Sequence, residues 1–173
     1  MPFRFRLALL ALLALPACVP APQPTPAPVH SAPATPAVAP SAAAPANWMD
    51  AAPTPGDWTW RNAAGASTAS FRGSTGQVLA ALRCDRAART VEVLRAGRTA
   101  EPGMTIRSEA ASRTLAAAAS ADGAWTVARL PAADRLLDAV AFSRGRFAVE
   151  AAGLPTLYLP AYPELTRVVE DCR

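Results

Sequence analysis

Few side chains in this 173-residue sequence can act as nucleophiles, bases or metal ligands. There is one histidine, His30, and no lysine, so all 17 basic residues are arginines. His30 stands in a tract of prolines and alanines, where a lone histidine is ordinarily a solvated bystander rather than a ligand. Catalytic Ser-His-Asp or Cys-His arrangements and Ser-x-x-Lys chemistry are therefore excluded from the region that is expected to fold.

Carboxylates are the remaining candidates for acid–base chemistry. Asp134 and Asp138 are four residues apart, on one side of an expected helix, and Glu170 and Asp171 lie near the end of the sequence. Paired carboxylates serve glycoside hydrolysis, so a cell-wall glycan hydrolase is one hypothesis. The favoured alternative is a solvated helix face or pairing with nearby arginines, with Asp134 placed to complement the helix dipole.

The run from residue 143 to residue 146 offers the best local binding chemistry. Arg144 and Arg146 flank a glycine after Ser143, at an expected helix-to-strand junction. Two such arginines can hold an anionic group in bidentate fashion, or they can pair with acidic groups at the end of the chain. Salt bridging is the favoured interpretation, and partner binding by Ser143, Arg144 and Arg146 stays open. Periplasmic lysozyme inhibitors, small disulfide-bonded β domains with a serine- and basic-residue-bearing loop, are a precedent in kind.

The N-terminal residues 1–18 have the pattern of a lipoprotein-type signal peptide. Arg4 and Arg6 precede an apolar run from Leu7 to Leu15, which ends in Leu-Pro-Ala-Cys at Cys18. This run is shorter than the roughly 20 residues that span a bilayer, and basic and small-residue flanks are typical of export. The ending resembles the bacterial lipobox, in which the cysteine carries lipid. A plain cut after Ala17, a short membrane anchor and a buried helix are the alternatives.

Residues 19–55 have the composition of a disordered stalk. They hold 11 of the 18 prolines and 12 alanines. Alternating prolines supply no donors to a sheet and do not continue a helix, and such a segment buries too little apolar surface to fold. The composition predicts a polyproline-type spacer, with a fully extended length of about 115 Å.

The remaining residues, 56–173, are expected to form a globular, mainly β (α+β) domain. Period-two alternation, which is typical of half-buried strands, gives these sets that share a face: Val78, Ala80, Leu82 and Cys84; Val91 and Val93; Met104, Ile106 and Ser108; Trp125 and Val127; Phe147, Val149 and Ala151; Leu157 and Leu159. The alanine-rich piece Ala111–Ala119 is ambiguous, and we expect a strand. Short strands at such spacing predict an antiparallel sandwich or barrel-like sheet.

Two short helices are expected among these strands. The first covers about 132–142, and the second begins at Pro163, a residue type that suits the first helical position. In the second helix four residues fall at i, i+3, i+4 and i+7, which is one helical face: Leu165, Val168, Val169 and Cys172.

The cysteines connect the sheet with this last helix. If Cys18 carries lipid, Cys84 and Cys172 remain as a pair in an oxidising compartment, each on the apolar side of its element. A disulfide would pin the C-terminal helix to the sheet. Two free buried thiols or a redox-active pair are the alternatives, although the sequence has no C-x-x-C motif. With these cysteines paired, zinc sites of His and Cys are excluded, glycine-rich phosphate cradles are absent, and no cofactor or metal is expected.

Charge in the domain argues against nucleic acid as a partner. Residues 56–173 hold 15 arginines against 12 aspartates and glutamates, a net charge of +3, and they contain no run of adjacent basic residues and no aromatic interleaving. The expected partners are the membrane, through the N-terminal lipid, and an envelope protein or an anionic glycan.

Three runs resemble a family of small envelope proteins of alphaproteobacteria, especially sphingomonads. They are Leu82–Asp85 (LRCD), Phe142–Phe147 (FSRGRF) and the tail Pro163–Arg173 (PELTRVVEDCR). The resemblance covers most of residues 57–173, and it implies an envelope location and a disulfide but no particular activity. More distantly, the L-R-C strand and the C-terminal cysteine are similar to accessory proteins of type VI secretion.

Together these patterns predict a lipid-anchored protein at the periplasmic face of the outer membrane. A non-enzymatic binding or structural role is the leading hypothesis. The alternatives are a carboxylate-dependent cell-wall glycan hydrolase and a secretion-system accessory protein.

Overall fold

The computed structural model describes residues 47–63 and 65–173. The predicted signal peptide with Cys18, and the part of the predicted stalk that includes His30, lie outside these residues. None of the described helices has the length and apolar character that crossing a membrane would require.

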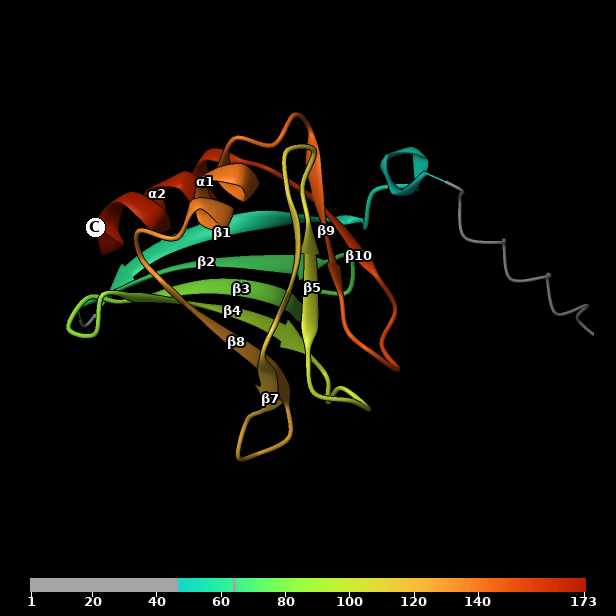
Figure 1. The fold of residues 1–173 in the computed structure, drawn as a ribbon, viewed down its shortest axis with the longest axis horizontal. Helices are drawn as coiled ribbons and strands as arrows, with labels where there is room; N and C mark the ends of the chain where they lie inside the picture. Colours follow the sequence, from blue (N-terminus) through green and yellow to red (C-terminus); the bar gives the residue numbers. More distant parts are fainter. Residues whose placement is uncertain (1–46, 64) are drawn as a thin grey trace, which may run out of the picture. The chain divides into compact units, whose positions relative to one another are not determined.

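In the residues that the structure describes, ten strands form two antiparallel sheets, as the alternation predicted (Figure 1). Sheet A has the order β1-β2-β3-β4-β8-β7, and its strands are β1 (Gly56–Ala63), β2 (Ala66–Gly73), β3 (Val78–Asp85), β4 (Thr90–Ala96), β8 (Trp125–Pro131) and β7 (Ala117–Ala119). Sheet B has the order β10-β9-β5-β6, and its strands are β10 (Leu157–Pro160), β9 (Arg146–Glu150), β5 (Met104–Arg107) and β6 (Ser112–Leu115). The ambiguous piece 111–119 is thus strand in two short parts, β6 and β7.

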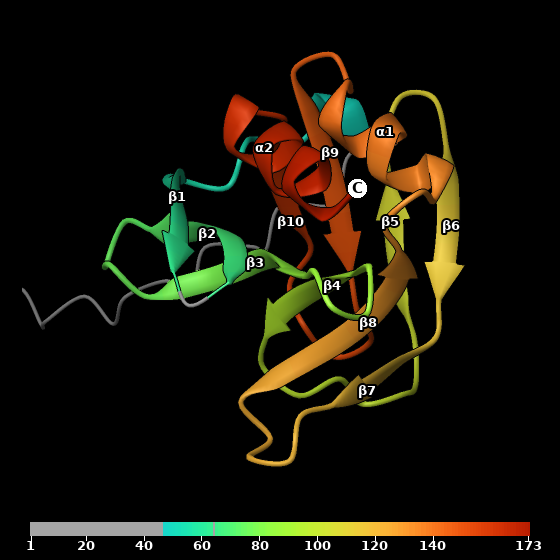
Figure 2. The ribbon, with the colours of Figure 1, turned by 90° about the vertical axis from the view of Figure 1, so that its left-hand side faces the viewer.

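The core lies between the inner face of sheet A and a second layer made of sheet B and two helices, α1 (Arg135–Ala141) and α2 (Pro163–Cys172) (Figure 2). Trp58 of β1 joins the layers, because its ring lies 5.3 Å from that of Phe71 in β2 and 6.5 Å from that of Phe147 in β9. Its indole N–H donates to the Pro160 carbonyl oxygen at 2.9 Å. Apolar burial and this polar contact together fix sheet B against sheet A.

Helix α2 has the amphipathic pattern that the sequence predicted. Pro163 opens it, and its buried residues are Leu165, Val168, Val169 and Cys172. The stripe packs on sheet A, chiefly on β2 and β3, and the Cys172 sulfur is bonded to that of Cys84 with the two Cα atoms 5.4 Å apart. The predicted disulfide between helix and sheet is therefore confirmed.

In strand β8 the most apolar residues lie on the outer face of the sheet and not on its buried face. In β8, Thr126, Ala128 and Leu130 are buried on the inner face, whereas Trp125 and Val127 belong to the outer face. The Thr126 hydroxyl is satisfied there, because it donates to the Gly97 carbonyl oxygen at 2.8 Å and accepts from the Thr99 N–H at 2.9 Å. Sheet A thus carries apolar side chains on the face that no other described element covers.

Residues 51–55, just before β1, lie against the free edge of β10. The Thr54 N–H donates to the Tyr158 carbonyl oxygen, and the Tyr158 N–H donates to the Thr54 hydroxyl oxygen, both at 2.9 Å. Ala51 is buried, and its carbonyl oxygen accepts a hydrogen bond from Arg146. These residues, which the composition assigned to the stalk, are packed on the domain in the structure.

Candidate functional site

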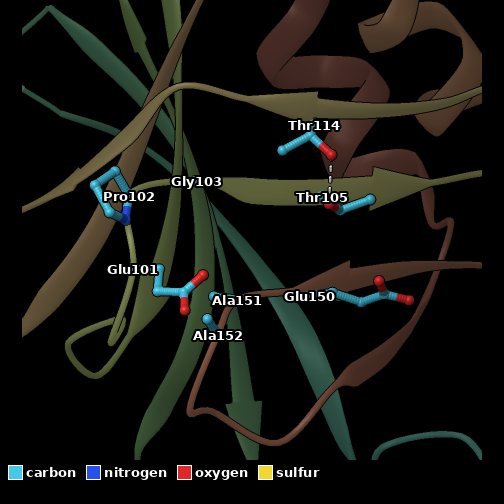
Figure 3. Close-up of a pocket in the computed structure, with 8 residues that line it drawn as sticks. All are labelled: Glu101, Pro102, Gly103, Thr105, Thr114, Glu150, Ala151 and Ala152. Atoms are coloured by element: carbon cyan, nitrogen blue, oxygen red, sulfur yellow. Dashed lines mark hydrogen bonds between the residues drawn. The ribbon is translucent and has the colours of Figure 1, made fainter.

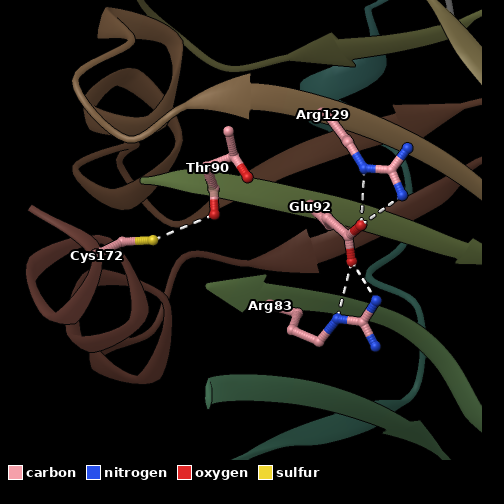
Figure 4. Close-up of polar contacts among 5 residues, drawn as sticks. All are labelled: Arg83, Thr90, Glu92, Arg129 and Cys172. Atoms are coloured by element: carbon pink, nitrogen blue, oxygen red, sulfur yellow. Dashed lines mark hydrogen bonds and ion pairs between the residues drawn. The ribbon is translucent and has the colours of Figure 1, made fainter. Parts of the chain in front are cut away.

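The outer face of sheet A carries a row of three charged side chains from neighbouring strands. The strand register places Arg83 of β3 opposite Glu92 of β4, and Glu92 opposite Arg129 of β8. Each of the three stands between apolar residues that point into the core. The pleat therefore sends all three charges to the outer face, side by side (Figure 4).

The two arginines share the central carboxylate. Arg83 donates to Oε2 of Glu92 from Nε at 2.8 Å and also from Nη2. Arg129 donates to Oε1 from Nε at 2.8 Å, and its Nη2 lies 2.8 Å from the same oxygen in an ion pair. Each guanidinium group thus keeps at least three of its five N–H donors free of Glu92.

Burial in this row is uneven. The Glu92 side chain is 8% exposed, whereas the side chains of Arg83 and Arg129 are 52% and 70% exposed. The carboxylate is therefore a buried anchor, and the two guanidinium groups extend from it to the surface. Their local charges sum to +1, so the row presents oriented donors and a net positive charge.

Two hollows flank this row and share Arg83 and Glu92. The first has a volume of about 520 Å³, and the second has one of about 580 Å³. The first lies toward β7 and is lined by Leu94, Ala118, Ala119, Ser120, Ala121, Asp122, Trp125, Val127 and Arg129. The second lies toward the β3–β4 turn and is lined by Gly65, Ala66, Cys84, Asp85, Arg86 and Ala87. Both volumes lie in the range of small-molecule sites.

The first hollow combines an apolar floor with charged ends. Leu94 and Val127 are opposite one another in the β4–β8 ladder and half-buried, and Trp125 lies two residues before Val127. At the far end from Arg129, a hydrogen bond from the Ser120 hydroxyl, followed by one from the Ala124 N–H, lowers the pKa of Asp122. The arrangement suits a ligand that has an anionic group beside an apolar surface.

A third hollow, of about 360 Å³, lies on the outer side of sheet B (Figure 3). Glu101 and Glu150 both line it, as a hydrolase would require of two carboxylates. Glu150, however, is ion-paired with Arg107 at 3.0 Å. The hydroxyl groups of Thr105 and Thr114 bond to each other across the strands at 2.7 Å.

The carboxylates that the sequence singled out for chemistry have structural partners. Asp134 caps the N-terminus of α1 by accepting from the Leu136 N–H at 2.8 Å, and it is ion-paired with Arg113 at 2.8 Å. Asp138 is ion-paired with Arg173 at 2.6 Å. The two side chains thus bind different partners and do not form a carboxylate pair.

Near the end of the chain, Asp171 accepts from the Ser67 hydroxyl at 2.5 Å and lies 3.8 Å from the guanidinium group of Arg86. Glu170 beside it is exposed. These contacts tie α2 to β2 and to the β3–β4 turn, which is a structural role.

Asp134 gives an expected pH dependence of stability. Burial works to raise its pKa, but the hydrogen bonds from Arg113 and the Leu136 N–H and the charge of Arg113 outweigh burial, so the pKa lies below its ordinary value. A carboxyl group with a lowered pKa stabilises the fold above its unfolded pKa, and this contribution is lost as the pH falls through the folded pKa. Asp134→Ala should therefore cost about 1 kcal/mol at neutral pH and much less in acid, at a pH below the folded pKa.

Urea unfolding followed by circular dichroism at both pH values measures this cost. Asp138→Ala is the matched control, because its ion pair with Arg173 is exposed and should contribute at most about 0.5 kcal/mol. An Asp134→Ala cost that is equal at both pH values would contradict the assignment.

The turn at residues 143–146 is built chiefly for structure. The buried Ser143 hydroxyl donates to the Arg146 carbonyl oxygen at 2.6 Å and accepts from the Glu109 N–H at 3.4 Å. Arg146 binds the Ala51 carbonyl oxygen rather than an acidic side chain. Of the three predicted partner-binding residues, Arg144 is the one that the structure leaves exposed.

The structure brings together functional residues that sequence reasoning did not select. Arg83, Glu92 and Arg129 each appear in the sequence as a single charge between apolar residues, in Leu-Arg-Cys, Val-Glu-Val and Ala-Arg-Leu. That signal was present, since opposite charges on alternating strands pair when the strands are neighbours. No group of three or more His, Cys, Asp or Glu suited to a metal ion occurs in the described part of the chain.

Comparison of the chain with known protein families, with curated proteins and with solved structures finds no match.

Proposed function

We propose that this chain is an exported, lipid-anchored protein of the cell envelope whose domain binds a partner without catalysing a reaction. The order of basic residues, apolar run and Cys18 in residues 1–18 supports export and lipidation. A Pro/Ala-rich stalk after Cys18 suits a domain held away from a membrane surface. The disulfide between Cys84 and Cys172 suits an oxidising compartment.

The observation that carries the binding role is the pair of arginines fixed on Glu92 at the outer face of sheet A. Because Glu92 already holds Arg83 and Arg129 in place, little side-chain freedom remains to be lost when a ligand binds. Their free N–H donors suit a carboxylate, phosphate or sulfate group. The adjoining apolar floor suits a partner that presents such a group beside apolar surface, and in the envelope this describes an anionic glycan or an acidic surface of an envelope protein.

The pairing of the acidic side chains favours binding over hydrolysis. Hydrolysis would need two carboxylates free to face the bond that is cleaved, whereas an ion pair engages the oxygens of a carboxylate with an arginine. Such ion pairs are made by Glu92, Asp134, Asp138, Glu150 and Asp171. A secretion-system accessory protein would use the same anchor and domain. The identity of the bound envelope protein distinguishes this role from other binding roles in the envelope.

The test begins with the anchor. Cys18→Ser removes the thiol that would carry the lipid, so we expect the full chain to move from the membrane fraction to the soluble fraction of disrupted cells. Immunoblots of the two fractions measure this, and globomycin should cause the unprocessed wild-type form to accumulate. A Cys18→Ser protein that stays with the membranes would contradict the lipid anchor.

The soluble Cys18→Ser chain then serves as bait for binding. Further substitution of Arg129→Gln should weaken retention of anionic glycan fragments or envelope proteins about tenfold, because a charged hydrogen-bond donor is lost. Arg144→Gln is the matched control, since Arg144 is an exposed arginine away from sheet A, and it should leave binding unchanged. Loss of binding only in the Arg144 variant would move the site to the 143–146 turn, and equal binding by both variants would overturn the arginine site.

A further inference from the structure

The open edge of sheet A differs from the other three sheet edges. β7, β6 and β10 are edge strands of 3, 4 and 4 residues, and β10 is also covered by Thr54. β1 is an edge strand of 8 residues, and no described strand runs along its outer side (Figures 1 and 2). Long uncovered edges are templates for pairing with another strand.

The direction of the backbone groups on this edge follows from one hydrogen bond. The Trp58 N–H donates to its neighbour's side chain, Asp57 Oδ1, at 2.8 Å. It therefore faces the open side. In an antiparallel strand, alternate residues direct their N–H and C=O groups to the same side, so Trp60 and Asn62 also present theirs to the open side.

The exposed side chains of β1 are complementary to themselves. Asp57, Thr59 and Arg61 all point to the outer face and are exposed. Among the described residues, neither Asp57 nor Arg61 takes part in an ion pair within the chain. Arg72 is opposite Asp57 in β2, but it donates to the Gly76 carbonyl oxygen instead.

We propose that β1 pairs with β1 of a second copy of this chain, antiparallel and two-fold symmetric about Thr59. In this register Asp57 lies opposite Arg61 of the second copy, and Arg61 opposite its Asp57, which gives two ion pairs on the outer face. Trp58 lies opposite Trp60, and both residues have open-side backbone groups, so they form hydrogen-bonded pairs. The Trp58 N–H then bonds to a backbone carbonyl group of the second copy, and Asp57 is released for its arginine.

Neighbouring registers lack this match. With Trp60 opposite itself, Arg61 would lie opposite Thr59 and Asp57 opposite Ala63. With Trp58 opposite itself, Asp57 would lie opposite Thr59 instead. Only the register about Thr59 satisfies both the direction of the hydrogen bonds and the charges.

The dimer would have one continuous sheet, with both outer faces of sheet A on the same side. A two-fold axis between antiparallel edge strands runs perpendicular to the sheet, so it does not invert the faces. The two Arg83–Glu92–Arg129 rows would then be presented together, as a bivalent surface.

A cross-linking experiment tests the register directly. Thr59 would lie opposite its own copy in a non-hydrogen-bonded pair, with Cα atoms about 4.5 Å apart, which is within the range of a disulfide. We expect the full-length Thr59→Cys chain, purified in detergent and treated with a mild oxidant, to form a covalent dimer on a non-reducing gel. Thr68→Cys is the matched control, because Thr68 lies on the same face but within the sheet on β2, and it should remain monomeric. The full-length chain without the Thr59→Cys substitution is a second control, which measures any cross-linking through Cys18.

Charge reversal distinguishes cross-linking within this dimer from cross-linking by chance collisions. In the Thr59→Cys chain, Asp57→Arg or Arg61→Asp alone would place like charges opposite each other and should lower the cross-linking rate about tenfold. Asp57→Arg and Arg61→Asp combined should restore the rate. Near-UV circular dichroism checks that each variant folds. A Thr59→Cys chain that stays monomeric, equal cross-linking by Thr68→Cys, or no effect of charge reversal would each overturn the proposal, whatever the outcome of the ligand-binding test.

Discussion

Replacing both Cys84 and Cys172 by alanine is expected to lower the free energy of unfolding by about 4–5 kcal/mol. The bond joins residues 88 positions apart, so it closes most of the folded domain into one loop. This closure lowers the conformational entropy of the unfolded chain, which is the source of the stabilisation. Total stabilities of single domains are about 5–15 kcal/mol. The variant should therefore be close to the limit of folding at 37 °C.

The location of this disulfide adds a structural consequence. Helix α2 has only ten residues, too few to be stable alone, and packing on sheet A has to hold it. Without the bond, we expect α2 to separate from the sheet first, because its buried apolar stripe is then reduced to three side chains, Leu165, Val168 and Val169. Hydrogen exchange in 163–172 should then be faster than in β3 and β4.

Urea unfolding at neutral pH measures the total loss. The reduced wild-type chain should unfold at nearly the same urea concentration as the double variant, because both lack only the cross-link. Cys18→Ala, which leaves the Cys84–Cys172 bond intact, should unfold like the oxidised wild type. A reduced protein as stable as the oxidised one would show that the bond is dispensable.

The elements with the strongest local periodicity could be predicted from the sequence. In α2, proline, an acidic first turn and an apolar stripe all indicate the same helix, and each is determined within ten residues. In the strands around Val91, Ile106 and Val149, the alternation of apolar and polar residues likewise indicates which side is buried. The disulfide followed because two such elements each placed a cysteine on the buried side.

The features that were missed depend on neighbours in space. The β1–β2 hairpin, Gly56–Gly73, was not predicted, because Ser, Thr and Ala in β2 give weak alternation. The inner face of β8 was obscured because Trp125 and Val127 are more apolar than Thr126, whose hydroxyl finds its partners in the loop at Gly97 and Thr99. The Arg83–Glu92–Arg129 row needs the strand order β3-β4-β8, and β4 and β8 are about 30 residues apart in the chain. Local patterns do not determine such pairing.

In the Arg83–Glu92–Arg129 row, loss of the two cations is expected to destabilise the fold more than loss of the anion. Replacing both Arg83 and Arg129 by methionine would leave the carboxylate of Glu92 nearly buried, at 8% exposure, without a cation. Removing the partners of a buried charge costs about 3–5 kcal/mol, and we expect about 3 kcal/mol because loss of the arginine side chains admits some water. Glu92→Gln alone should cost only about 1 kcal/mol, since the exposed arginines can be hydrated instead.

The decisive variant combines all three substitutions. Adding Glu92→Gln to the double methionine variant removes the unpaired charge, and we expect it to recover about 2 kcal/mol of the loss. Urea unfolding of the four proteins at neutral pH gives the comparison. If Glu92→Gln alone is as damaging as the double variant, or if it fails to rescue that variant, then the carboxylate is not the buried anchor of the site. If the rescue occurs, Glu92 is what fixes two otherwise solvated arginines in place, which is the preorganisation that binding an anionic partner requires.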